Sequence, residues 1–240
     1  WDTPEHRLDD DLRTDPSGKP YPPFHDVQVV LDGDVAAALG SVARERWLRA
    51  TGKKITRVAA GGEELWPEGV GVDLHEVDVA IARTDPGIDG LMVSREVEAL
   101  YLASVARAER YIYVENQYFT AGRVAAALAE SLERDSGPEV VLVLPQENWD
   151  WLEQATMSDR RAKLIAALRR ADRHGRLRVL CPLNGDVAIH VHAKMMIADD
   201  RLVRIGSANL SNRSMGLDSE CDIAIEAEDA GAVRRLLARL

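Results

Sequence analysis

Features that would restrict a protein to a special class are scarce in this 240-residue sequence. Its 2 cysteines, Cys181 and Cys221, are too few for a disulfide framework or a four-cysteine zinc site. No apolar run approaches the ~20 residues that a membrane-spanning helix needs. Positive charge is also scarce, because 30 Lys and Arg residues face 40 Asp and Glu residues, a formal net charge of −10. This balance argues against non-specific nucleic-acid binding and leaves room for a small anionic substrate in a locally positive pocket.

What is present predicts an α/β fold. An Asp- and Pro-rich stretch at 1–24 comes first, and a Gly-rich connection lies at 51–75. Short β-branched or apolar runs predict strands at 27–31, 77–82, 111–115, 139–145, 176–183, 193–199, 201–207 and 221–226. Helical spacing of apolar residues predicts helices at 35–50, 97–108, 122–135, 160–175 and 229–240. The alternation favours an α-β-α sandwich, a mixed and largely parallel sheet with helices on both faces.

The most informative stretch begins at His192-Ala193-Lys194. On a strand, residues two apart share a face, so His192 and Lys194 project together and place an imidazole beside an ammonium. The Ser207 hydroxyl and the Asn209 amide follow the next strand and can donate to the same anion. Each residue alone has an ordinary structural explanation, such as a hairpin turn at Asp199. Their combination in this order predicts a phosphate site.

The stretch at 190–220, HVHAKMMIADDRLVRIGSANLSNRSMGLDSE, resembles the H-x-K-x4-D region of the phospholipase D superfamily, in the second of its two copies. YIYVENQYFT at 111–120 resembles the segment that opens the second half of such enzymes. PFHDVQVVLDGDVAAALGSVARERW at 23–47 resembles the segment that follows the first copy. The resemblance implies that 1–75 is the tail of a first phospholipase D-like half and that 76–240 is the second half.

A second H-x-K motif does not occur in these 240 residues. The other histidines, His6, His25, His75, His174 and His190, lack a lysine two positions on. Trp1 falls just after the place where the first motif would end. We therefore expect the sequence to be the C-terminal portion of a longer enzyme, with the first motif and its histidine outside it.

In the superfamily, one motif histidine attacks phosphorus and the other protonates the leaving alcohol and then activates the acceptor. By this resemblance, His192 is the general acid/base, while Lys194 and Asn209 bind phosphate oxygens. Ser207 supplies a supporting hydroxyl. Glu220 is expected to accept a hydrogen bond from the far nitrogen of His192, as the acid of a catalytic triad does.

Four further residues receive roles from the resemblance or from their positions. Asp26 matches the equivalent carboxylate of the first half, which would orient the absent nucleophile, and is expected to lack a partner here. Asn116 and Gln117 follow a strand and are candidate substrate-binding residues. Asp199 is expected to hold the hairpin. The chemistry requires no metal or other cofactor.

The favoured activity is hydrolysis or transfer of the phosphatidyl groups of phospholipids at a membrane surface, through a phosphohistidine. The expected partners are the lipid and the missing N-terminal half, with no nucleic acid. Two alternatives remain, a homodimeric nuclease of the same superfamily and a catalytically incomplete fragment that binds phosphate. The expected location is the cytoplasm or the periphery of a membrane.

Overall fold

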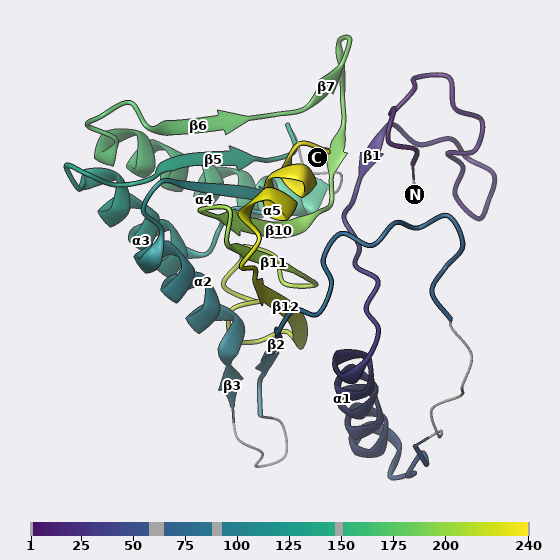
Figure 1. The fold of residues 1–240 in the computed structure, drawn as a ribbon. Helices are drawn as coiled ribbons and strands as arrows, with labels where there is room; N and C mark the ends of the chain where they lie inside the picture. Colours follow the sequence, from purple (N-terminus) through teal and green to yellow (C-terminus); the bar gives the residue numbers. More distant parts are fainter. Residues whose placement is uncertain (1, 58–64, 88–92, 147–150, 240) are drawn as a thin grey trace.

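The computed structural model describes residues 2–57, 65–87, 93–146 and 151–239. Within these residues an 8-stranded sheet forms the centre of the molecule (Figure 1). Its strands lie side by side in the order β3-β2-β12-β11-β10-β4-β5-β6. Their bounds along the chain are β2 Val79–Asp85, β3 Ser94–Arg95, β4 Tyr111–Asn116, β5 Glu139–Val143, β6 Leu177–Leu180, β10 Lys194–Ala198, β11 Leu202–Gly206 and β12 Glu220–Glu226.

The mixed α/β sandwich is confirmed, but the parallel part of the sheet is smaller than expected. β4 pairs with β5 and β5 with β6 in parallel, connected by α3 (Gly122–Glu133) and α4 (Trp151–Ala171). The pairs from β3 across to β4 are antiparallel. Parallel neighbours need a crossover helix, whereas β10, β11 and β12 follow one another without a helix between them. The absence of crossovers explains why β11 pairs antiparallel with both β10 and β12.

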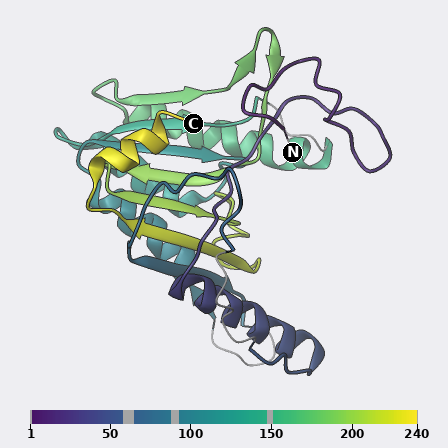
Figure 2. The same ribbon diagram turned by 45° about the vertical axis from the view of Figure 1, so that its right-hand side comes forward.

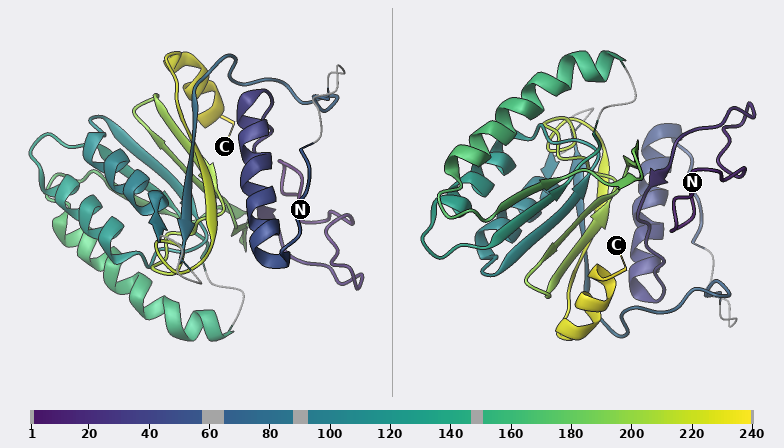
Figure 3. Two further views of the ribbon diagram at one scale, coloured as in Figure 1. Left: turned by 90° about the horizontal axis from the view of Figure 1, so that it is seen from below. Right: turned by 90° about the horizontal axis from the view of Figure 1, so that it is seen from above.

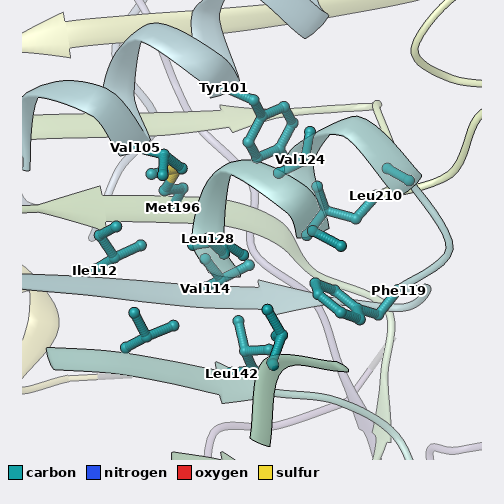
Figure 4. Close-up of a cluster of buried hydrophobic side chains, with 14 of the residues drawn as sticks. Tyr101, Val105, Ile112, Val114, Phe119, Val124, Leu128, Leu142, Met196 and Leu210 are labelled. Carbon is teal, nitrogen blue, oxygen red and sulfur yellow. The ribbon is translucent and has the colours of Figure 1, made fainter. Parts of the chain in front are cut away.

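One face of the sheet is covered by α2 (Glu96–Arg107), α3 and α4 (Figure 3). α3 places Val124, Leu128 and Leu132 at the i, i+4 and i+8 positions, and each is at most 1% exposed. These side chains pack on alternate residues of the strands beneath, such as Ile112 and Val114 of β4 (Figure 4). Alternate residues of the strands and every third or fourth residue of the helices thus meet in one layer, which is the main core.

The opposite face carries a second apolar cluster. Its buried members come from β10, β11, β12 and the C-terminal helix α5 (Ala230–Leu237), and they include Met195, Ile197, Val203, Ile205, Ile223, Ile225 and Val233. Val27, Leu31, Leu74 and Val77 pack against this cluster while only partly buried. The N-terminal part of the chain therefore lies over the sheet face that α5 covers incompletely (Figure 3).

The N-terminal part differs most from the sequence-based expectation. The strand predicted at 27–31 is wrong, because the strand found is β1 (Phe24–His25), which pairs in parallel with β9 (His190–Val191). Val29 and Val30 are 40% and 43% exposed, and no strand edge lies beside them in the described chain to accept their backbone hydrogen bonds. The β-branched run thus lacks the neighbour that a strand requires.

The helix predicted at 35–50 is present as α1 (Asp34–Thr51), yet it buries none of its side chains. It ends at Gly52, whose φ of 68° is the left-handed conformation that a glycine adopts without strain. Figure 2 shows α1 extending past the lower edge of the sheet. Of the predicted connection at 51–75, residues 58–64 lie outside the described residues.

A small hairpin, β7 (Leu183–Asn184) and β8 (Val187–Ala188), follows β6 and precedes β9. The strand predicted at 176–183 therefore ends early, at Leu180. Among the described helices, none has the length and apolar content needed to cross a bilayer.

Candidate active site

The H-x-K residues lie at one edge of the large sheet, where several strands begin or end. β4 ends at Asn116 opposite Lys194, the first residue of antiparallel β10. β11 ends at Gly206 opposite Asp222, close to the start of antiparallel β12. Because adjacent antiparallel strands run in opposite directions, two strand ends and two strand starts meet here. The sheet gathers residues that are far apart in the sequence.

His192 follows β9 directly and makes an acid–imidazole contact. Its Nδ1 atom lies 2.8 Å from Oδ2 of Asp26. The backbone N–H of His192 donates to the carbonyl of His25 at 2.7 Å, and the Phe24 ring stacks on the imidazole with 5.3 Å between centroids. The side chains of His192 and Asp26 remain 39% and 31% exposed, so a substrate can reach the imidazole.

The charge of Asp26 fixes the orientation of this imidazole. Burial alone would raise the pKa of Asp26, but the hydrogen bond and charge of His192, together with the ammonium of Lys194, lower it below its usual value. Asp26 is therefore a carboxylate at neutral pH, and a carboxylate favours the imidazole tautomer with its proton on Nδ1. Nε2 is then the atom that can take up or deliver a proton.

The expected contact between Glu220 and His192 is wrong. Glu220 instead accepts a hydrogen bond from the Ser207 hydroxyl at 2.5 Å, and that hydroxyl oxygen accepts from the N–H of Cys221 at 3.0 Å. The expectation that Asp26 lacks a partner is also wrong, because Asp26 holds the position assigned to Glu220. The cause is the parallel β1–β9 pairing, which brings Asp26 beside His192 from a distant part of the chain.

Lys194 is a buried cation next to His192. The side chain is 7% exposed, and its Nζ atom donates to the His192 carbonyl and, at 3.3 Å, to Oε1 of Gln117. Burial lowers the pKa of Lys194 to about 8, against the opposing charges of Asp26 and Glu220. The ammonium is thus charged at neutral pH, where an anion would relieve its desolvation.

Asn209 and Asn116 both contact the loop that follows β11. The backbone N–H of Asn209 donates to Oγ of Ser214 at 3.2 Å, while its side-chain Oδ1 is buried without a hydrogen-bond partner among the described residues. Asn116 is 0% exposed, and its Oδ1 accepts from the N–H groups of Leu210 at 2.9 Å and Tyr118 at 3.1 Å. Oδ1 thus positions the backbone, while Nδ2 of Asn116 is buried without a hydrogen-bond partner among the described residues, and its substrate contact stays a prediction. Gln117, beside Lys194, remains a substrate-binding prediction.

Asp199 has the contacts of a structural residue. It begins the turn between β10 and β11, where Asp199 and Asp200 both have a φ of 56°. Positive φ at two central residues matches a type I′ hairpin turn, and Asp tolerates it better than most residues. The carboxylate also accepts from three successive backbone N–H groups, those of Glu109, Arg110 and Tyr111, at 2.6, 2.8 and 2.9 Å. It fixes the hairpin to the start of β4.

A buried ion pair beneath the site was not anticipated from the sequence. Arg204 of β11 and Asp222 of β12 are both 0% exposed, with Nε of Arg204 2.8 Å from Oδ2 of Asp222. The guanidinium also donates to the carbonyls of Ala208 at 3.1 Å and Lys194 at 3.4 Å, and it contacts the Tyr101 hydroxyl. The ion pair therefore joins the backbone of β10, at Lys194, to the loop that carries Asn209. The sequence does contain a signal for this ion pair, because Arg204 and Asp222 each interrupt an apolar strand run, RLVRIG and CDIAIE.

Gly206 is required by the same ion pair. A Cβ atom at this position would lie 1.9 Å from Oδ1 of Asp222, which no side chain could tolerate. Oδ1 of Asp222 also accepts from the N–H of Ala208 at 3.1 Å. The glycine of the G-S-x-N sequence thus makes room for the carboxylate that fixes the following loop.

Together these residues combine a proton-transfer group, a buried cation and several hydrogen-bonding groups at one sheet edge. This set has the chemistry to bind an oxyanion and to exchange a proton with a leaving or attacking hydroxyl, which the cleavage of a phosphate ester requires. In the described ranges of the chain, no three His, Cys, Asp or Glu side chains are grouped so as to hold a metal ion.

Comparison with known families agrees with this class of site. A family model described as "Cardiolipin synthase, PLD-like domain" matches residues 101–239. The chain therefore belongs to the PLD-like domain family, within the phospholipase D superfamily. The match includes His192, Lys194, Asn209 and Glu220 but not Asp26.

Curated relatives are phospholipases D that are much longer than this chain. Identity to a phospholipase D of Phytophthora infestans is 28% over 183 residues, which cover 58% of this chain and 10% of the relative. Identity to phospholipase D alpha 3 of Arabidopsis thaliana is 24% over 301 residues, covering 88% of this chain and 36% of the relative. The chain thus spans about a third of the length of the plant enzyme and 10% of the length of the oomycete enzyme.

Solved structures share the fold. Phosphatidylserine synthase of Haemophilus influenzae aligns with a TM-score of 0.52 and 17% identity, covering 88% of this chain and 46% of that one. Nuc, a phospholipase D family member from Salmonella typhimurium, aligns with a TM-score of 0.50 and 20% identity, covering 68% and 92%. At these identities the likeness establishes the architecture.

Proposed function

We propose that this chain supplies one half of the active site of a phospholipase D-type phosphodiesterase, which hydrolyses or transfers the phosphatidyl groups of phospholipids. The observation that carries the proposal is the contact of His192 with Asp26 beside the buried ammonium of Lys194. The match to phospholipases D over most of the chain supports lipid as the substrate class.

In this proposal His192 is the general acid/base. Asp26 keeps the proton on Nδ1, so Nε2 can protonate the leaving alcohol and then remove a proton from the attacking water or alcohol. Lys194, charged below a pH of about 8, and the Asn209 amide stabilise the charge that develops on the phosphate oxygens. Covalent phosphohistidine chemistry needs a second histidine as nucleophile, and it comes from an H-x-K motif outside these residues.

The same logic gives Glu220 a role. Asp26, from the segment that resembles the first half, contacts the histidine of the second half. If the two halves are related by a pseudo-twofold axis, Glu220 of the second half contacts the histidine of the first. Its hydrogen bond from exposed Ser207 holds the carboxylate at the same sheet edge until that histidine is present.

The test is an assay on phosphatidylcholine vesicles and on single-stranded DNA, with the chain alone and together with a segment that carries a second H-x-K motif. We expect lipid cleavage only in the mixture, and a loss of about 10³-fold or more in His192→Ala. His174→Gln, which changes a histidine that is paired with Asp135 away from the site, is the matched control and should keep full activity.

Denaturing the reaction at alkaline pH, where the P–N bond of a histidine adduct persists, separates the roles of the two histidines. A phosphatidyl group trapped on the histidine of the second H-x-K segment, with choline released, supports the assignment, whereas a phosphatidyl group on His192 would reverse it. Cleavage of DNA but not of lipid would replace the proposal by the homodimeric nuclease. Phosphate binding without cleavage of either substrate would support the alternative of a catalytically incomplete fragment that binds phosphate.

A further inference from the structure

A second acid–imidazole contact lies outside the H-x-K motif. Oε2 of Glu115, in β4, is 2.7 Å from Nε2 of His25, in β1. The other carboxylate oxygen of Glu115 accepts from the Tyr113 hydroxyl at 2.5 Å. The Glu115 side chain is only 2% exposed and that of His25 is 18% exposed. Burying a carboxylate this deeply costs free energy unless the carboxylate is paired. The fold therefore strongly favours the contact between Glu115 and His25.

The charges of the two groups reinforce the contact. Burial disfavours the charged form of His25, but the hydrogen bond and charge of Glu115 outweigh burial, and the pKa of His25 is raised. The ring of His6 packs edge-on against the ring of His25, with 5.5 Å between centroids. His25 is therefore fixed from two sides, by the sheet and by the N-terminal segment.

The backbone of β1 connects the His25–Glu115 contact to the contact between Asp26 and His192. β1 has 2 residues, and its ladder with β9 includes the bond from the His192 N–H to the His25 carbonyl at 2.7 Å. Asp26 is the next residue, and its carboxylate meets His192 at 2.8 Å. A ladder of this length has too few hydrogen bonds to be stable alone. The side chain of His25 ties β1 to β4 of the large sheet, in addition to the contacts of Phe24 with His192 and Asp2.

We propose that His25 and Glu115 form a positioning pair, which fixes β1 against β9 and so keeps the Asp26 carboxylate on the His192 imidazole. Neither residue touches the reacting atoms. The consequence for catalysis rests on the proposed function, whereas the positioning itself does not.

The experiment that tests the positioning is proton NMR of the whole chain. An imidazole Nδ1 proton held by a carboxylate gives a low-field resonance, and its loss in Asp26→Asn assigns it to His192. We expect His25→Ala to abolish or broaden this resonance while the chain stays folded by circular dichroism. His25→Gln, which keeps a donor for Glu115, should restore part of it. Tyr113→Phe removes the other bond to the same carboxylate and is the control that should leave the resonance in place.

Activity gives an independent readout. In the two-motif assay we expect His25→Ala to lower kcat about tenfold with KM changed less than twofold, and to add less than a twofold loss in the Asp26→Asn background. A folded His25→Ala chain that retains the resonance would overturn the positioning pair. Retention of the predicted NMR pattern without any phosphodiesterase activity would overturn the proposed function alone.

Discussion

The sheet and the N-terminal segment, residues 2–57, are held by different kinds of interaction. α3 buries Val124, Leu128 and Leu132 against the sheet, whereas the side chains of α1 are at most half-buried. The N-terminal segment packs only the partly buried Val27 and Leu31 against the second apolar cluster, and polar contacts such as the β1–β9 ladder and the His25–Glu115 pair join it further to the sheet. The difference teaches that a fully buried apolar core sets the shape of the sheet, while the segment that brings Asp26 to His192 depends more on hydrogen bonds.

The largest expected effect breaks the sheet. Arg204→Met leaves the Asp222 carboxylate buried and unpaired, because both side chains of the ion pair are 0% exposed. Removing one partner of such a pair costs about 3–5 kcal/mol. Urea denaturation should show this loss in the global free energy of unfolding. The double variant Arg204→Met/Asp222→Leu should recover part of it, and a single variant as stable as the parent would contradict the role given to the pair.

A smaller effect should release the N-terminal segment while the sheet stays intact. The Asp2 carboxylate is 1% exposed, accepts from the Phe24 N–H at 2.9 Å and lies 3.0 Å from Nη1 of Arg13. Asp2→Ala should lower hydrogen-exchange protection of the segment by about 2 kcal/mol, the size of a charge-assisted hydrogen bond. Amides of β10 to β12 should keep their protection. Asp9→Ala, an exposed carboxylate of the same segment, is the control.

A third effect concerns Lys194, at the boundary between the two regions. Its pKa of about 8 means that the ammonium loses its proton as the pH rises through 8. The affinity for inorganic phosphate should therefore fall above pH 8, by up to about tenfold per pH unit, or 1.4 kcal/mol. Isothermal calorimetry across pH 6–10 would measure this. Lys194→Arg stays charged, so a fall of the same size in that variant would contradict the assignment.

The smallest effect sharpens the contrast between the helices. Trp47 of α1 is 47% exposed, and Trp47→Ala should lower the free energy of unfolding by less than about 1 kcal/mol. Leu128 of α3 is 1% exposed, and Leu128→Ala should cost about 2–5 kcal/mol. Thermal unfolding of the two variants in the isolated chain measures both. Equal losses would mean that α1 shares the apolar core after all.

Elements with a local signal in the sequence are found where the sequence predicts them. The apolar periods of α3, β4 and β5 and the turn at Asp199-Asp200 predict elements that the structure contains. The spacing of His192 and Lys194 predicts that both side chains project together; in the structure His192 lies between β9 and β10, and both residues act on the Asp26 carboxylate. These features depend on neighbours within a few positions.

Features whose partner lies far along the chain have no such signal and are predicted wrongly. The run at 27–31 has strand composition, but a strand exists only beside another strand, and none adjoins this run in the described structure. Likewise, nothing near Asp26 reveals that its partner is His192, so the acid of the pair was assigned to Glu220. Both errors come from contacts that depend on tertiary packing.

The pairing of Asp26 with His192 also constrains when the site can form during synthesis. The two residues are 166 positions apart, so a ribosome adding about 5–20 residues per second makes the carboxylate roughly 10 to 30 s before the imidazole. Until β9 has emerged, Asp26 has no histidine to orient, and β1 has no strand to pair with. A nascent chain cannot therefore assemble its acid–base pair early. The contact between Asp26 and His192 forms only after most of the sheet has been translated.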